Sequence, residues 1–265
     1  MTSSNGGAPV AIYVQSNDAA ANEVLAFARA ADGRLGTVRR YATGGRGTGM
    51  PHLPSQNPLS ADDADPAQVA FSSNGRTLVV TERGTDSISA YTIGEDGRAS
   101  GPATVRATGK TPYGFDFTPS GSLVVTEAFG GAVGAAAVSS YSVAEAASLA
   151  PVSGSVGDTR SEVCWAAVTN DGRFAYVTDF GDGTISSYAV ADDGGLALRE
   201  PVAGSTRLGE KGVRDEALTD DGRFLYAIDA DARKVFGWAV GGDGTLETIG
   251  AFEGLPETVA GLAAS

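Results

Sequence analysis

One short pattern recurs along the chain: a tight polar turn, then an apolar strand, then a carboxylate where the strand ends. Its clearest copy runs from Thr169 to Asp179, and the others span 73–82, 119–127 and 220–229. The turn glycines, which lie 46, 51 and 50 residues apart, are Gly75, Gly121, Gly172 and Gly222. Asn-Gly and Asp-Gly turns connect antiparallel strands because they reach positive φ at low cost. The pattern therefore predicts a repeat protein built from short strands.

Each complete repeat contains four strand-like runs. A four-stranded repeat of about 50 residues is typical of a β-propeller blade. The complete units are expected at about 65–109, 111–160, 162–207 and 212–257. The first unit, 9–45, has three runs, and 258–264 resembles the missing one. Because an unpaired strand edge exposes backbone hydrogen-bonding groups, we expect the C-terminal strand to complete the first blade. The prediction is an all-β propeller with five countable blades, in a single domain spanning 1–265.

Composition narrows the range of partners. With 32 acidic and 19 basic residues, the formal net charge of −13 argues against binding to nucleic acid or to an anionic membrane surface. Cys164 is the only cysteine, which excludes an intramolecular disulfide and a cysteine-based zinc site. The N-terminus lacks the basic and apolar regions of a secretory signal, so we expect a cytoplasmic protein.

The segment 46–64 breaks the repeat. It is rich in Gly, Pro, Ser and Asp, and it contains His52, the only histidine of the chain. A loop of this length inside a compact domain is usually functional or marks an irregularity. If the segment is functional, His52 is a candidate substrate-binding residue. The simpler alternative is that His52 is exposed to solvent and has no role in function.

Several motifs resemble the lactonase family of β-propellers, which includes 6-phosphogluconolactonase-like proteins and carboxymuconate cyclase. The residues that carry the resemblance are Asp65–Ser72 with Thr81-Glu82, Gly114–Phe117 with Thr126–Gly131, Cys164-Trp165, and Ala260–Ala264. The resemblance covers nearly the whole chain and implies a hydrolase that opens the ring of a sugar lactone or a carboxylated lactone.

The blade count departs from the family resembled, which has seven blades. The departure lies near Gln56-Asn57, where two blades are inferred to be absent by natural deletion or by engineering. Closing five blades into a ring would widen the wedge per blade from ~51° to ~72°. Three outcomes stay open: a strained five-bladed ring, an open arc, or a homo-oligomer that covers the exposed blade edges.

Two groups of residues are candidates for chemistry. The carboxylates that end the second strands could form a ring that binds a divalent cation such as calcium, with Glu127 also a candidate base. Alternatively, each could cap a local turn or accept from backbone N–H groups of its neighbouring blade. These carboxylates are Glu82, Glu127, Asp179 and Asp229.

The second group lies on the innermost strands, which line the channel of a propeller. Gln68, Tyr113 and Trp165 are candidate substrate-binding residues there. Arg214 could polarise a lactone carbonyl, while Asp215 or Glu216 activates water. The alternative is an ordinary arginine–acid pair in a wet channel.

The resemblance to the family implies a lactone hydrolase with a small-molecule lactone as its partner. The sequence contains no GxSxG, P-loop, HExxH or EF-hand motif, and no cofactor is required. The competing hypothesis is a blade-deleted propeller scaffold that folds or self-associates without catalysis.

Overall fold

A computed structural model describes residues 11–49 and 64–265, and it contains five four-stranded antiparallel sheets. Blade 1 combines both ends of the described chain, as predicted: β20 (Val259–Ala264) pairs with β1 (Ala11–Ser16), followed by β2 (Glu23–Arg29) and β3 (Leu35–Ala42). The C-terminal strand thus completes the first blade and covers the edge of β1. His52 and most of the segment 46–64 lie outside the described residues.

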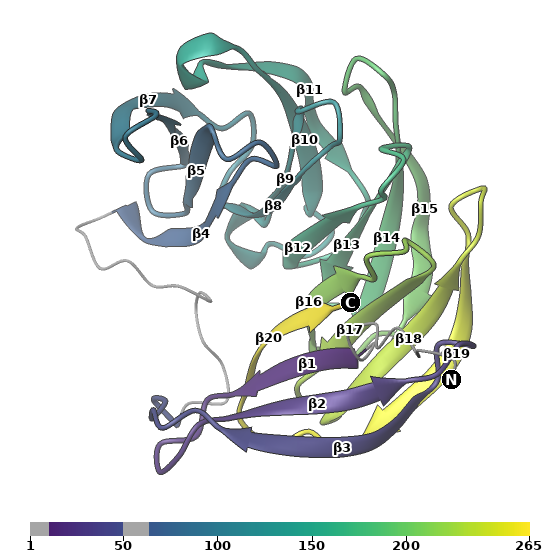
Figure 1. The fold of residues 1–265 in the computed structure, drawn as a ribbon. Helices are drawn as coiled ribbons and strands as arrows, with labels where there is room; N and C mark the ends of the chain where they lie inside the picture. Colours follow the sequence, from purple (N-terminus) through teal and green to yellow (C-terminus); the bar gives the residue numbers. More distant parts are fainter. Residues whose placement is uncertain (1–10, 50–63) are drawn as a thin grey trace, which may run out of the picture.

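The other four blades follow one another along the chain (Figure 1). Blade 2 consists of β4 (Pro66–Phe71), β5 (Thr77–Glu82), β6 (Ser87–Ile93) and β7 (Ala99–Arg106). Blade 3 consists of β8 (Pro112–Phe117), β9 (Leu123–Glu127), β10 (Ala137–Val143) and β11 (Leu149–Gly157), with the short 3₁₀ helices η2 (Phe129–Gly131) and η3 (Glu145–Ala147).

Blade 4 consists of β12 (Val163–Val168), β13 (Phe174–Asp179), β14 (Thr184–Val190) and β15 (Leu196–Ser205). Blade 5 consists of β16 (Val213–Leu218), β17 (Phe224–Asp229), β18 (Lys234–Val240) and β19 (Leu246–Glu253). The repeat pattern therefore predicted the five-bladed fold correctly. Within the described ranges, no helix is long and apolar enough to span a membrane.

The hydrophobic core is divided into four clusters, each lying between two neighbouring blades. Phe27 of blade 1 packs with Tyr226 of blade 5, and Leu225 of blade 5 packs with Tyr176 of blade 4. The other two clusters join blade 3 to blade 4 and blade 2 to blade 3. No such cluster joins blade 1 to blade 2 among the described residues, and Figure 1 shows these two blades at the ends of an arc.

Burial of the second strands identifies which blade faces are covered. In blades 3 and 5 every residue of the second strand is buried, because a neighbour packs on both faces. In β5 of blade 2, residues on one face, such as Val79, are buried, whereas Leu78 and Val80 on the other face are partly exposed. β1 of blade 1 shows the same alternation. Since alternate residues of a strand point to opposite faces, each end blade has one uncovered face. The described chain therefore adopts the open arc rather than a strained five-bladed ring, and the homo-oligomer stays a prediction.

A threonine precedes the carboxylate in three second strands, and it ties each blade to the next. The hydroxyl groups of Thr81, Thr126 and Thr178 donate to the backbone carbonyls of Tyr113, Cys164 and Arg214, over 2.5, 2.6 and 2.5 Å. Each acceptor belongs to the innermost strand of the following blade. These bonds fix the height of one inner strand against the next, and so position the residues that line the axis.

Candidate functional site

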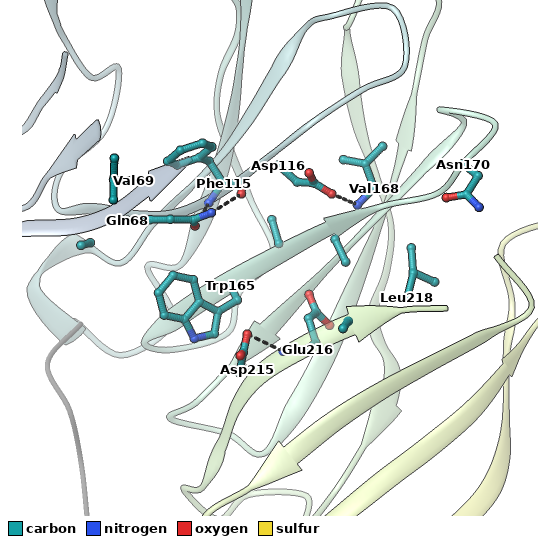
Figure 2. A pocket seen from close by; sticks show the side chains of 14 residues that line it. Gln68, Val69, Phe115, Asp116, Trp165, Val168, Asn170, Asp215, Glu216 and Leu218 are labelled. Carbon is teal, nitrogen blue, oxygen red and sulfur yellow. Dashed lines mark hydrogen bonds between the residues drawn. The ribbon is translucent and has the colours of Figure 1, made fainter. Parts of the chain in front are cut away.

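The innermost strands β4, β8, β12 and β16 surround a cavity of about 390 Å³ (Figure 2). Its wall includes four residues that the sequence singled out, Gln68, Trp165, Asp215 and Glu216. It also includes Asp116, which was not predicted to be a site residue. Among the described residues, the wall thus contains three carboxyl groups and no lysine or arginine.

Hydrogen bonds between blades hold three of the polar side chains in place. The Gln68 amide pairs with the backbone of Phe115 in both directions, over 2.8 and 3.0 Å. Asp116 accepts from the backbone N–H of Val168 in the next blade, at 2.8 Å. Asp215 accepts from the N–H of Leu262 on β20, at 2.6 Å, and from the N–H of Glu216, at 3.0 Å. These side chains are therefore positioned by the blade-to-blade packing before any ligand arrives.

Glu216 differs from its neighbours because its carboxyl group has no partner in the described part of the chain. The residue is 6% exposed, and neither of its carboxyl oxygens accepts or donates a hydrogen bond there. Burial raises the pKa of Glu216 well above its ordinary value, and the charges of Asp215, Asp179 and Asp116 raise it further. A carboxyl group in this environment favours the protonated form, which can donate an O–H to a ligand oxygen.

Aromatic rings form one side of the cavity and its surroundings. The indole of Trp165 packs edge-on against the ring of Tyr113, with centroids 5.3 Å apart. The Arg83 guanidinium lies 5.2 Å from the centre of the Tyr113 ring, and burial raises the pKa of Tyr113 to about 12. Tyr113 itself is not part of the cavity wall, so its contribution is to support Trp165.

Gly114 allows β8 and β12 to approach each other beside Trp165. A Cβ atom at Gly114 would lie 2.5 Å from the carbonyl oxygen of Cys164 and 2.7 Å from the Cα of Trp165. Both distances are far below van der Waals contact, so only glycine fits here without displacement of the backbone.

Arg214 is not among the residues of the cavity wall. Its guanidinium lies 4.8 Å from the centre of the Phe180 ring. Of the three consecutive charged residues of β16, the cavity wall therefore includes Asp215 and Glu216.

The carboxylates at the ends of the second strands accept hydrogen bonds from their own blade or from the loop that leads into it. Glu127 accepts from the backbone N–H of Gly109 at 2.7 Å and from the hydroxyls of Ser139 and Ser155 at 2.7 and 2.6 Å. Ser89 donates to Glu82 at 2.6 Å, and Thr206 donates to Asp229 at 2.7 Å.

Asp179 follows the same arrangement, with Ser186 donating at 2.7 Å. Burial raises the pKa of Asp179 well above its ordinary value, and the charge of Asp158 raises it further. Residues 11–49 and 64–265 contain no group of three or more His, Cys, Asp or Glu side chains that could hold a metal ion. The four carboxylates are thus engaged by local donors rather than arranged around a common point, and the divalent cation stays a prediction on which no step below depends.

Asp116 is the residue that sequence reasoning missed. It is the one charged residue in the otherwise uncharged strand Pro112–Phe117, and burial raises its pKa. An isolated charge in an inner strand was the available signal, because such a group needs a partner to offset its desolvation.

A comparison with known protein families supports the propeller fold. The family described as "Lactonase, 7-bladed beta-propeller" matches residues 20–129 and 129–265. The chain belongs to this lactonase family. It has five blades in the described structure, where the family description names seven. No curated protein sequence matches the chain significantly.

Solved structures similar to this lactonase-family propeller share its fold at low sequence identity. A putative 6-phosphogluconolactonase from Bacteroides uniformis has a TM-score of 0.59 and 18% identity, over 93% of this chain and 72% of that one. The periplasmic gluconolactonase PpgL of Pseudomonas aeruginosa has a TM-score of 0.56 and 17% identity, over 96% and 69%. A protein from Lactobacillus plantarum has a TM-score of 0.60 and 17% identity, over 94% and 71%. Nearly all of this chain thus corresponds to about 70% of each neighbour.

Proposed function

We propose that this propeller hydrolyses the ring ester of a neutral sugar lactone in the cavity lined by β4, β8, β12 and β16. The observation that carries the proposal is the carboxyl group of Glu216, which is buried in the cavity wall with both oxygens unpartnered in the described structure. Family membership and the lactonase-like neighbours support the reaction class. The cytoplasmic location stays a prediction from the sequence.

In the proposed reaction, Asp215 accepts a proton from water while the water oxygen attacks the lactone carbonyl carbon. Asp215 suits this role because it accepts hydrogen bonds from two backbone N–H groups, as an ionised carboxylate does. The protonated carboxyl of Glu216 donates a hydrogen bond to the carbonyl oxygen, where negative charge develops.

Collapse of the tetrahedral intermediate breaks the bond between the carbonyl carbon and the ring oxygen. The leaving ring oxygen takes the proton from Asp215, which restores the enzyme, and the product is an open-chain hydroxy acid. Ionisation of that acid in solution releases one proton per turnover.

The charge of the cavity wall supports a neutral substrate. Asp116, Asp215 and Glu216 lie in the wall, and none of its lining residues in the described parts of the chain is a lysine or arginine that could pair with a phosphate or carboxylate substituent. An anionic substituent would therefore lose its hydration without gaining a counter-ion. A sugar ring instead offers hydroxyl groups to the carboxyls and C–H groups to the indole of Trp165.

The test is a pH-stat assay on three lactones: gluconolactone, its 6-phosphate, and a carboxylated muconolactone. We expect turnover of the neutral lactone only, and a loss of about 100-fold or more in kcat on Glu216→Leu, which has no donor; this is the size typical of removing one donor to a developing oxyanion. Glu200→Leu, at an exposed acid of β15, is the matched control and keeps full activity.

A folded protein that leaves all three lactones unchanged would refute the hydrolase and favour the scaffold. Faster turnover of the phosphorylated or carboxylated lactone would refute the neutral substrate while leaving the reaction class intact.

A further inference from the structure

The arc ends in two blade faces that no neighbouring blade covers in the described structure. The face of blade 1 that points away from blade 5 includes Tyr13, Ala26, Arg39 and Tyr41, and these line an open hollow of about 490 Å³. The strand register places them side by side, since Tyr13 pairs with Ala26 and Ala26 pairs with Arg39. Tyr41 is 52% exposed.

The uncovered face of blade 2 is apolar. Phe71 pairs with Leu78, and Leu78 pairs with Tyr91, so these three side chains share the face opposite to Val79 and Ala90, which pack against blade 3. Phe71 is 58% exposed, and Leu78 and Tyr91 are partly exposed.

At two of the four interfaces within the arc, a tyrosine of one blade contacts a turn of the following blade. The hydroxyl of Tyr176 in blade 4 donates to the carbonyl of Gly244 in blade 5, at 3.0 Å. Likewise, the hydroxyl of Tyr226 in blade 5 donates to the carbonyl of Gly33 in blade 1. Tyr13 occupies the same place in blade 1, three residues before the end of the second strand, and it faces the open side.

At these two interfaces, the glycine of the accepting turn also packs closely against the preceding blade. A Cβ atom at Gly33 would lie 2.6 Å from the ring of Phe224 in blade 5, and one at Gly244 would lie 2.6 Å from the ring of Phe174 in blade 4. The equivalent Asp-Gly turn of blade 2 ends at Gly97, and a Cβ atom there would meet nothing within 4 Å. In the described structure, Tyr13 of blade 1 therefore has no following blade to contact. Likewise, the turn of blade 2 that ends at Gly97 has no preceding blade to contact.

We propose that a second copy of this chain supplies both missing neighbours, with the Tyr13 face of blade 1 packing on the Phe71 face of blade 2 of the next copy. The contact continues the interface already formed four times within the arc, and it places the Tyr13 hydroxyl against the carbonyl of Gly97. Because it joins two different surfaces, it is a head-to-tail contact, which adds copy after copy unless the rotation closes a ring.

Two exposed positions allow each half of the contact to be blocked separately. Tyr41→Asp places a charge on the blade 1 face, and Phe71→Asp places one on the blade 2 face. Sedimentation velocity of the full chain over a concentration series is the measurement. We expect the unmodified chain to form species larger than a dimer as concentration rises, and each variant alone to remain monomeric.

The decisive sample is an equimolar mixture of the two variants. Each retains one intact face, so a head-to-tail contact produces 1:1 dimers and nothing larger. Val133→Asp, at a 92% exposed apolar side chain in blade 3, is the control and associates as the unmodified chain does.

Three results would overturn the proposal: an unmodified chain that stays monomeric at high concentration, association of either variant on its own, or a mixture that remains monomeric. Association of Phe71→Asp alone would indicate instead that two blade 1 faces meet each other. Loss of association in Val133→Asp would place the contact elsewhere.

Discussion

Asp116 on β8 and Val168 on β12 join the inner strands of two adjacent blades through a hydrogen bond of 2.8 Å between the carboxylate and the backbone N–H. The same relation recurs between Asp215 and Leu262, two blades further along the arc. Side chains that line the cavity thus also connect the blades, so their substitution changes stability as well as chemistry.

Replacing Asp116 with alanine removes the acceptor of the Val168 N–H. We expect the free energy of unfolding to fall by about 1–3 kcal/mol, the cost of leaving a buried donor unsatisfied. Denaturant unfolding at neutral pH measures it, with Asp192→Ala, at an exposed turn residue, as the control. An Asp116→Ala protein as stable as the control would show that the bond contributes nothing.

The raised pKa of Glu216 predicts that the stability of the folded protein depends on pH. The pKa of Glu216 is raised in the folded state. At any pH between the ordinary value of 4.5 and the raised value, the folded protein therefore keeps the Glu216 proton, whereas the unfolded chain has released it. Stability is therefore lost as pH rises through that window, by roughly 1.4 kcal/mol for each pH unit that the window spans.

The Glu216→Gln variant has no such proton to lose. We expect it to match the unmodified protein near pH 4 and to exceed its stability at pH 8, as measured by urea unfolding at both values. Glu200→Gln should follow the unmodified protein at both. A Glu216→Gln variant that is less stable at pH 8 would contradict the raised pKa.

Tyr226 and Tyr13 occupy equivalent positions in blades 5 and 1, so their phenylalanine variants can be compared to test the hydrogen bond between blades. Tyr226→Phe removes the hydrogen bond to Gly33, so we expect a loss of about 0.5–1.5 kcal/mol in the free energy of unfolding. Tyr13→Phe should leave the stability of the dilute protein unchanged. Equal effects in both variants would argue against the open end of blade 1.

Gly114 should not tolerate a side chain. Gly114→Ala forces β8 away from β12 beside Trp165, and we expect a loss of about 1–3 kcal/mol, as for other overpacked sites. Gly242→Ala, where a Cβ atom would meet nothing within 4 Å, is the control. Thermal unfolding followed by the fluorescence of Trp165 and Trp238 measures the loss of stability.

The sequence was sufficient to predict the blades, because the turn glycines and the carboxylates that end the second strands of blades 2 to 5 recur at a nearly fixed spacing. It also predicted that 258–264 pairs with 10–14, and the observed strands Val259–Ala264 and Ala11–Ser16 confirm this. It did not decide between ring and arc, since closure depends on the angle between blades, which no local pattern encodes.

The candidate site was predicted only in part. Charges on the inner strand led to Asp215 and Glu216, but the same reasoning was not applied to Asp116. The direction of the second-strand acids was harder to foresee, although the serines that bind Glu82, Glu127 and Asp179 recur in the third strands at Ser89, Ser139 and Ser186. Whether an acid faces the axis or its own blade depends on strand register, which becomes visible only in three dimensions.

The pairing of β20 with β1 also has a consequence for biosynthesis. β1, β2 and β3 precede the other four blades in the chain, whereas β20, which covers the inner edge of β1, follows all four. The fourth strand of blade 1 is therefore not available during translation until synthesis has passed Val259, after the strands of blades 2 to 5 have been made.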